Sequence, residues 1–148
     1  MARDDTILIA EDSADYAMFM TMALRETAGG KPVHFVENGD EAIQYLEGRG
    51  KYNDREVFAF PAMLLLDLKM PGVDGFDVLR WMQENPVRRV IPTIVLSSSV
   101  LERDVKEAYA LGATAYLGKP ADLGDLKTML GDLFKFWAWS IRPERPLG

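Results

Sequence analysis

Charged and hydroxyl-bearing residues stand directly after several short apolar runs of this sequence. Ligands of an open parallel sheet bind beyond the carboxyl ends of its strands, so these positions are the first to inspect for chemistry. One such residue alone is more often a helix cap or a turn residue, but recurrence after four separate runs predicts a shared site. The residues are Glu11, Asp12, Asp67, Ser97, Ser98 and Lys119.

The chemistry that suits this set is metal-assisted phosphoryl transfer. Converging carboxylates repel one another unless a cation lies among them, and an all-oxygen cluster in a chain without cysteine suits Mg²⁺. Asp12 and Asp67 are predicted to bind the metal directly, and Glu11 through water. A carboxylate nucleophile can form an aspartyl phosphate, whose developing charge needs the metal, a lysine and a hydroxyl. Asp67 is the predicted nucleophile, with Lys119 and Ser97 as the stabilising groups.

Five apolar runs must position these residues, and each is predicted to be a strand. Three of them contain the stretches ILIA, MLLL and TIVL, which are apolar throughout rather than at alternate positions. This pattern is typical of parallel strands that helices cover on both faces, and the segments between the runs have helical spacing. An α/β fold with a repeated strand–helix unit is therefore expected. The runs are Thr6–Ala10, Pro32–Val36, Ala62–Leu66, Thr93–Leu96 and Thr114–Leu117.

Capping residues predict where the helices begin, because oxygen-bearing side chains precede several apolar-periodic stretches. The second predicted helix ends near Gly48. Residues 48–61 then form a polar and aromatic insert that is longer than the usual connection, and we predict a surface loop of unassigned role. The predicted helix starts are Asp12 or Ser13, the cluster that begins at Asn38, Asp74 and Asp122.

The last predicted helix, which starts near Leu123, carries more apolar side chains than docking on a sheet requires. Phe134 and Phe136 lie two residues apart and cannot both face one core. We therefore predict that aromatic residues here, Phe134 and Trp137 foremost, contact a second copy of the chain or a kinase. Packing of these aromatic side chains, Trp139 included, in the core remains the alternative.

Length and composition bound the other possibilities. The 148 residues, 48% of them hydrophobic, suit a single domain over residues 1–148. A net charge of −6 and the absence of long like-charge runs argue against direct nucleic-acid binding. No cysteine, signal-peptide pattern or membrane-spanning run is found, so a cytoplasmic location is expected. Pro143 and Pro146 are expected to end regular structure in a tail, residues 138–148.

Four segments together resemble the receiver domains of two-component response regulators, across residues 5–137. The spacing of Asp67, the Met70-Pro71 pair and the Asp74-Gly75 turn is the most specific part. The resemblance implies a single receiver domain with a flavodoxin-like (βα)5 fold and a five-stranded parallel sheet of order 2-1-3-4-5. The segments are ILIAEDSADY, LLLDLKMPGVDGFDVL, PTIVLSSS and GATAYLGKP.

The resemblance also implies roles for the residues of the predicted site. Asp67 matches the phosphoacceptor, and Glu11 with Asp12 matches the acidic pair that binds Mg²⁺. The backbone carbonyl of Lys69 is implied as a further metal ligand, and Lys119 as the phosphate-binding lysine. A glutamate at position 11 departs from the commoner aspartate, but it keeps the required charge.

The implied switch is a hydroxyl and an aromatic ring. Phosphorylation would draw Ser97 toward Asp67, and Tyr116 would turn into the vacated space, changing the face formed by the fourth predicted helix, the fifth strand and the fifth helix. Lys69 and Ser99 match positions that tune the lifetime of the phosphoryl group.

Further implications concern the backbone and the partners. A cis peptide is expected between Lys119 and Pro120, although Ala121 stands where many members have phenylalanine. The expected partner is a sensor histidine kinase, with no enzymatic activity beyond the protein's own phosphotransfer and autodephosphorylation. The insert at 48–61 and the aromatic ending FKFWAWS resemble the stand-alone regulators paired with bacterial phytochrome kinases.

Three other functions remain to be weighed. A haloacid-dehalogenase-type phosphatase also uses an aspartate nucleophile with Mg²⁺, but there the acidic pair comes last and a second aspartate stands where this chain has Lys69. A receiver-like interaction module without phosphorylation would have lost site residues, and none is lost. A flavodoxin needs a hydroxyl-rich loop where this chain has Glu11 and Asp12. The single histidine, His34, is assigned no role.

Overall fold

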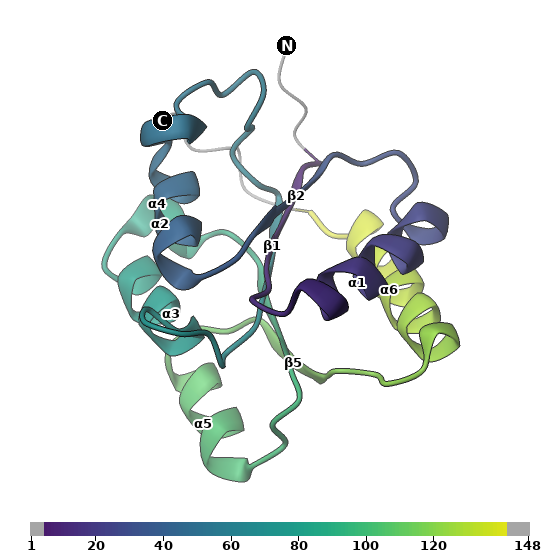
Figure 1. The fold of residues 1–148 in the computed structure, drawn as a ribbon. Coiled ribbons are helices and arrows are strands. Elements are labelled where there is room, and N and C mark those ends of the chain that lie inside the picture. Colours follow the sequence, from purple (N-terminus) through teal and green to yellow (C-terminus); the bar gives the residue numbers. More distant parts are fainter. Residues whose placement is uncertain (1–4, 142–148) are drawn as a thin grey trace.

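The computed structural model describes residues 5–141 (Figure 1). Its five strands form one parallel sheet in the order β2-β1-β3-β4-β5, which confirms the expected flavodoxin-like topology. Each predicted run matches a strand, with bounds that differ by one residue at most. The strands are β1 (Ile7–Ala10), β2 (Val33–Val36), β3 (Met63–Leu66), β4 (Thr93–Ser97) and β5 (Ala115–Gly118).

Helices cover both faces of this sheet. Helices α1 and α6 lie on one face, and α2, α3 and α5 lie on the other (Figure 1). A four-residue helix, α4, and the short 3₁₀ helix η1 were not expected from the sequence. The helices are α1 (Ala14–Thr27), α2 (Gly39–Glu47), η1 (Gly50–Tyr52), α3 (Gly75–Gln83), α4 (Pro86–Arg89), α5 (Glu102–Ala110) and α6 (Leu123–Ala138).

The helix starts follow the predicted caps, except at α5. At four helix starts the capping side chain accepts a hydrogen bond from the backbone N–H three residues later, an N–H that has no partner within the helix. These caps are Ser13, Asn38, Asp74 and Asp122. Helix α5 starts after Leu101 without a side-chain cap, and for that reason no signal marked it.

Two cores result, one on each face of the sheet, because successive side chains of a strand point to opposite faces. Leu8 and Leu64 pack toward α2, α3 and α5, whereas Ile9 and Leu65 pack toward α1 and α6. Each such buried side chain contributes about 1.5–3 kcal/mol relative to full exposure. Strands β1, β3 and β4 are buried along their whole length, as the continuous apolar runs predicted.

The insert, residues 48–61, is more than a surface loop. Tyr52 and Phe60 are buried in the core on the α2 side, and the rings of Tyr45 and Phe58 pack around Tyr52. The length and polarity of the segment suggested solvent exposure, but its aromatic side chains fold back onto α2 and strand β2. The ring of His34 joins this aromatic group through Tyr45 and Phe58.

Helix α6 divides its aromatic residues between the core and solvent. Phe134 is buried in the core beside α1, so the single chain exposes little of it, and its contact with a partner stays a prediction. Trp137 packs against the same core, and its contact with a partner stays a prediction. Phe136 and Trp139 are exposed by 69% and 88%. Residues 142–148 of the predicted tail, with Pro143 and Pro146, lie outside the described residues.

Within residues 5–141, no helix combines the length and apolar character that crossing a membrane requires.

Candidate functional site

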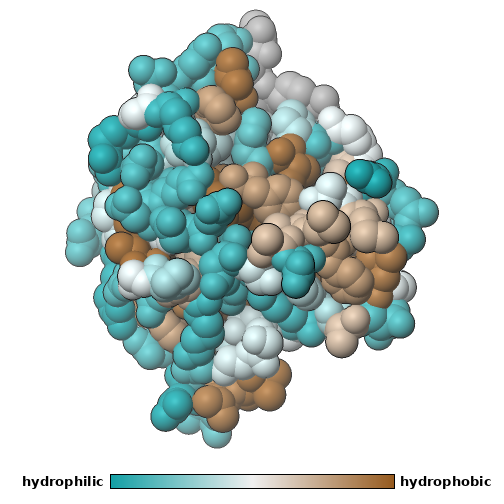
Figure 2. Space-filling model, viewed as in Figure 1, coloured by the Kyte–Doolittle hydropathy of each residue, from teal (hydrophilic) through white to brown (hydrophobic). Residues whose placement is uncertain are grey.

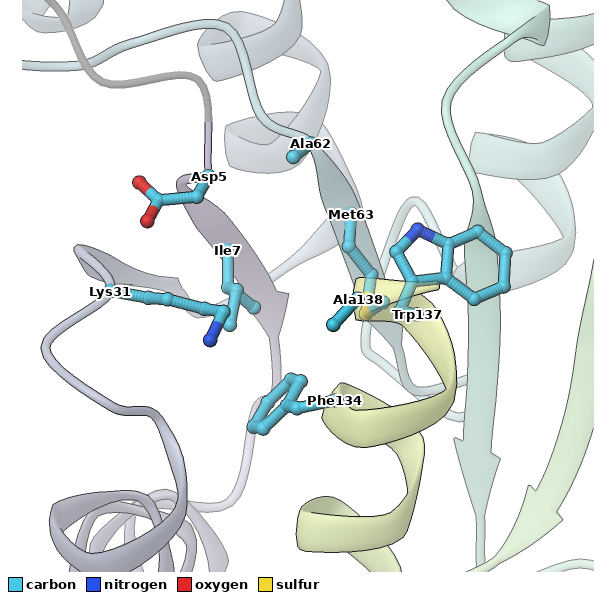
Figure 3. A pocket seen from close by; sticks show the side chains of 8 residues that line it. All are labelled: Asp5, Ile7, Lys31, Ala62, Met63, Phe134, Trp137 and Ala138. Atoms are coloured by element: carbon cyan, nitrogen blue, oxygen red, sulfur yellow. The ribbon is translucent and has the colours of Figure 1, made fainter. Parts of the chain in front are cut away.

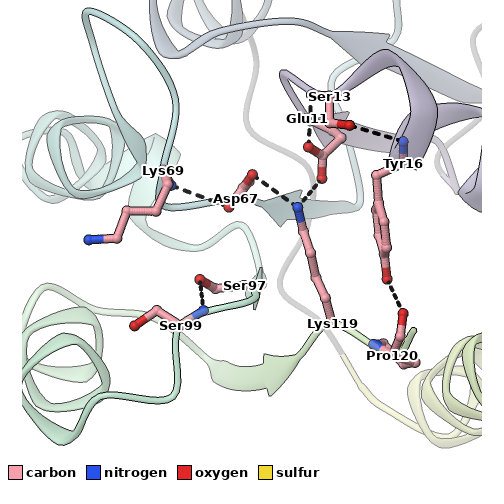
Figure 4. A network of polar contacts seen from close by, with 9 residues as sticks. All are labelled: Glu11, Ser13, Tyr16, Asp67, Lys69, Ser97, Ser99, Lys119 and Pro120. Atoms are coloured by element: carbon pink, nitrogen blue, oxygen red, sulfur yellow. Dashed lines mark hydrogen bonds and ion pairs between the residues drawn. The ribbon is translucent and has the colours of Figure 1, made fainter.

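The predicted site residues gather at the carboxyl ends of four neighbouring strands. Glu11 follows β1, Asp67 follows β3, Ser97 ends β4 and Lys119 follows β5. Because these strands are adjacent in the sheet, residues far apart in the sequence come together at one edge (Figure 4). We call Glu11, Asp12, Asp67, Ser97 and Lys119 the carboxyl-end rim.

Lys119 links two carboxylates of the rim. Its Nζ lies 2.7 Å from Glu11 Oε1 and 3.1 Å from Asp67 Oδ2, and all three side chains are largely buried (Figure 4). Burial alone would lower the pKa of Lys119, but the hydrogen bond to Glu11 and the charges of both carboxylates raise it above its ordinary value. Lys119 is therefore a fixed positive charge beside Asp67.

Asp12 joins the two carboxylates that Lys119 contacts. Ligand oxygens of Glu11, Asp12 and Asp67 all lie within 4.8 Å of one another. Burial raises the pKa of the Glu11 carboxyl, against the lowering effects of Lys119 and of the Ser13 backbone N–H. The cluster keeps more negative than positive charge and consists of hard oxygen atoms. These residues fit a divalent cation of the Mg²⁺ type.

The backbone after β3 shapes the surroundings of Asp67. The Lys69 N–H donates to Asp67 Oδ1 at 3.2 Å, which fixes the orientation of the carboxylate. A Cβ atom at Gly75 would lie 2.4 Å from the Asp67 carbonyl oxygen, so only glycine allows α3 to begin this close. The role of the Lys69 carbonyl as a metal ligand stays a prediction.

The loop after β4 is organised around Ser99. Its N–H donates to Ser97 Oγ at 3.1 Å, and its carbonyl accepts from the Tyr116 hydroxyl at 2.8 Å. Ser97 is fully buried, and its own carbonyl accepts from the Lys119 N–H. The predicted switch residues, Ser97 and Tyr116, are thus joined through one intervening residue.

The peptide bond between Lys119 and Pro120 is trans, which corrects the cis bond expected from the resemblance. A trans bond is the lower-energy form for most X-Pro pairs. In this arrangement the Pro120 carbonyl accepts a hydrogen bond from the Tyr16 hydroxyl at 3.0 Å.

Sequence reasoning missed two residues that touch this site. The ring of Tyr16 lies under Lys119, with Nζ 4.5 Å from its centroid, and burial together with the charges of Glu11 and Asp67 raises the pKa of Tyr16 to about 12. Asp104 contacts both Lys69 and Ser99. A tyrosine or an aspartate in a first helical turn is too common to mark either residue from sequence.

A small pocket lies at the opposite end of the sheet (Figure 3). It is lined by Ile7 and Met63, at the starts of β1 and β3, and by Phe134 and Trp137 of α6. Its volume of about 60 Å³ is enough for one or two water molecules, so it competes poorly with the rim as a ligand site.

Comparison with known sequences agrees with this geometry. The response regulator receiver domain matches residues 7–131. The response regulator Rcp1 of Synechocystis is 32% identical over 135 residues, which cover 91% of this chain and 90% of Rcp1. The probable methanogenesis regulatory protein FilR2 of Methanothrix harundinacea is 32% identical over 141 residues, covering 93% of this chain and 86% of FilR2.

Solved structures of response regulators are also similar to this chain. The phosphorylated cyanobacterial phytochrome response regulator RcpA is 30% identical and superposes with a TM-score of 0.86, covering 96% of this chain and all of RcpA. The Mn²⁺-bound form of Rcp1, also 30% identical, has a TM-score of 0.82 over 95% of this chain and 99% of Rcp1. One of these relatives was thus crystallised in its phosphorylated form and the other with Mn²⁺ bound.

Proposed function

Because this chain belongs to the response regulator receiver domain family, we propose that Asp67 is the residue that accepts the phosphoryl group from a histidine kinase. The observation that carries this proposal is the position of Asp67 beside Lys119, 3.1 Å away, with ligand oxygens of Glu11 and Asp12 within 4.8 Å of its carboxylate. A nucleophilic carboxylate beside a fixed ammonium and a metal-binding cluster is what transfer of a phosphoryl group requires.

Each residue of the rim has its own role in the phosphoryl transfer. An Asp67 carboxylate oxygen attacks phosphorus, a P–O bond forms, and the P–N bond of the phosphohistidine breaks with its electron pair passing to the departing imidazole. Lys119 and the Ser97 hydroxyl stabilise charge on the phosphoryl oxygens. Asp12, Asp67 and the Lys69 carbonyl would hold Mg²⁺ directly and Glu11 through water, and the metal would supply positive charge for the transferred group.

The signal then passes through the loop after β4. A bond from the Ser97 hydroxyl to the phosphoryl group would alter the contact that Ser97 Oγ now makes with the Ser99 N–H. Tyr116 is bonded to the carbonyl of the same Ser99, so the two changes are coupled. The face formed by α5, β5 and α6 changes as a result.

The proposal is tested by incubating the protein with acetyl phosphate and Mg²⁺ and measuring its intact mass. The parent should gain one phosphoryl group, and Asp67→Asn should gain none. Asp132→Asn, which removes an exposed carboxylate of α6, is the matched control and should be labelled like the parent. Labelling of Asp67→Asn, or no labelling of the parent, would contradict the proposal.

The proposed partner is a sensor histidine kinase of the phytochrome type, in the cytoplasm. The support is the likeness to RcpA, together with an exposed apolar strip on α1. Met18 and Met22 lie one turn apart there, 69% and 45% exposed, and Figure 2 shows apolar residues gathered on the α1 side of the molecule. Phosphotransfer should be faster from a phytochrome-type kinase than from an unrelated kinase, and equal rates would refute the pairing.

A homodimer is the second proposed contact, through α6. Its support is the exposure of Phe136 and Trp139 beside the half-buried Trp137. Sedimentation of the beryllofluoride-treated protein should give a dimer, and Phe136→Ser should weaken it. A monomer at high concentration in both states would remove this part of the proposal.

A further inference from the structure

Asp104 is a buried carboxylate in the first turn of α5, and the proposed phosphotransfer gives it no role. It is 5% exposed. Its Oδ2 accepts a hydrogen bond from the Ser99 hydroxyl at 2.6 Å and lies 3.5 Å from Lys69 Nζ. A buried carboxylate is costly unless it has such partners, so these contacts are the condition for its burial.

Its two partners each lie two residues beyond a residue of the phosphorylation site. Lys69 follows Asp67 by two residues, and its N–H donates to the Asp67 carboxylate. Ser99 follows Ser97 by two residues, and its N–H donates to the Ser97 hydroxyl oxygen. Asp104 therefore joins the loop after β3 to the loop after β4. We call Lys69, Asp104 and Ser99 the Asp104 clasp.

The clasp holds Lys69 away from Asp67. In Figure 4 the Lys69 side chain extends away from the Asp67 carboxylate, on the side opposite Lys119. Its backbone, however, lies against that carboxylate, so the ammonium needs only side-chain rotations to approach a group bound there. The side chain is 58% exposed, which leaves it room to move.

The two bonds to Asp104 differ in strength. The Ser99 hydrogen bond is the largest single cause that keeps the pKa of the Asp104 carboxyl below its ordinary value, and the Lys69 ammonium also lowers this pKa, against the effect of burial. The Ser99 bond is short, whereas the Lys69 contact is longer and close to solvent. The ammonium can therefore leave while the carboxylate keeps a hydrogen-bond donor.

On this geometry, and on the proposed function, we propose that Asp104 competes with the phosphoryl group on Asp67 for the Lys69 ammonium. Phosphorylation places roughly −1.5 to −2 of charge beside Lys69, against the single charge of Asp104. The ammonium then passes from Asp104 to the phosphoryl oxygens, and α5 loses one of its two polar links to the site. Asp104 acts as a positioning residue that weakens phosphoryl binding and ties α5 to the unphosphorylated state.

The test is the affinity for beryllofluoride, a phosphoryl mimic, measured by calorimetry in the presence of Mg²⁺. Asp104→Asn keeps the shape of the side chain and an acceptor for Ser99 but frees Lys69. Because an ion pair with one solvent-exposed partner is weak, binding should tighten by only about three- to fivefold. Thermal unfolding of each variant checks that it is folded.

Two controls separate this role from a general effect of charge or structure. Glu102→Gln removes another carboxylate from the same helical turn. Glu102 pairs with Lys106 and not with Lys69, so this variant should leave the affinity for beryllofluoride unchanged. In a Lys69→Met background the competition no longer exists, so Asp104→Asn should change the affinity by less than about twofold.

Equal tightening in the Lys69→Met background or with Glu102→Gln would overturn the inference. So would unchanged or weaker binding by Asp104→Asn, with the parent binding normally. Failure of the parent itself to bind beryllofluoride would instead refute the proposed phosphorylation of Asp67, so the two failures are distinguishable.

Discussion

At the carboxyl-end rim, three carboxylates lie together and one ammonium contacts two of them, whereas in the insert one guanidinium is held by three backbone carbonyls. The Arg55 guanidinium donates to the carbonyls of Tyr45 and Leu46, which end α2, and to that of Phe58. A cation at this end of a helix also complements the helix dipole. In the insert the cation is thus held by groups of the fold itself, whereas the rim keeps an excess of negative charge.

This difference separates binding from stability. Excess negative charge at the rim is the condition for binding a cation and a phosphoryl group, and it contributes little to folding. The bonds of Arg55 join α2 to the insert, and they stabilise the fold. Substitutions at the rim should therefore change chemistry, and substitutions in the insert should change stability.

The largest expected effect is on the rim, in Lys119→Met. Loss of the fixed ammonium should slow labelling by acetyl phosphate by about 10²–10³-fold, because one charge-stabilising group at a reacting centre is worth that much. Lys127→Met, which removes an ammonium paired with Glu26 on the surface, is the matched control and should label at the parent's rate. A Lys119→Met variant that labels normally would mean that the rim does not stabilise phosphoryl charge.

The corresponding change in the insert is Arg55→Met. It leaves the carbonyls of Tyr45 and Leu46 without this donor, and we expect a loss of about 2–3 kcal/mol in the free energy of unfolding. Urea denaturation measures this loss, with the exposed Arg49→Met as control. Labelling of Asp67 below the unfolding transition should stay at the parent's rate, and a reduced rate would break the separation between the two regions.

Addition of Mg²⁺ should stabilise the protein through the rim alone. At ten times the dissociation constant the gain is about 1.4 kcal/mol, or roughly 3–5 °C in Tm for a chain of this size. The metal binds the charged carboxylates, and burial holds the pKa of Glu11 above its ordinary value. The gain is therefore present above that raised pKa and is lost as the pH falls through it.

Calorimetric scans at several pH values, with and without Mg²⁺, measure this dependence. Glu11→Gln removes the titrating group and should reduce the gain. A gain that persists below the ordinary pKa of a glutamate would show that the metal binds elsewhere.

The smallest expected effect is that of Tyr52→Phe in the insert. It removes the hydrogen bond from the Tyr52 hydroxyl to Glu41 and should cost about 1 kcal/mol near neutral pH. Burial alone would raise the pKa of Glu41, but this bond, the Glu37 N–H and Lys51 outweigh it and lower the pKa. The contribution is therefore present above the ordinary pKa of a glutamate and disappears as the pH falls through the lowered one.

Urea denaturation of the parent and the variant as a function of pH measures this contribution. A difference between them that is unchanged in acid would mean that it does not involve the Glu41 carboxylate.

The sequence predicted best those features that depend on a local pattern of neighbouring residues. Continuous apolar runs predicted the buried parallel strands, and capping side chains such as Ser13 and Asp74 predicted four helix starts. The convergence of Asp67 and Lys119 followed from one property of parallel sheets, the shared edge of their carboxyl ends.

What the sequence did not reveal depends on contacts between distant side chains. Asp104 resembles an ordinary acid in a first helical turn until Lys69 and Ser99 are seen beside it. Tyr52 and Phe60 lie in a segment whose polarity favours exposure, and their burial depends on the surface of α2. Phe134 and Phe136 were correctly expected to face different ways, but periodicity alone did not decide which of them the core would take.

The close start of α3 has a consequence for how the site can move. At Gly75 the backbone of α3 packs directly against the backbone of Asp67 and Leu68, so no side-chain rotation there could absorb a displacement. On the other side of Asp67, the loop after β4 is held only by rotatable polar groups around Ser99. One wall of the site is therefore rigid and the other adjustable, so added bulk and charge at Asp67 displace the adjustable wall and carry the change toward α5.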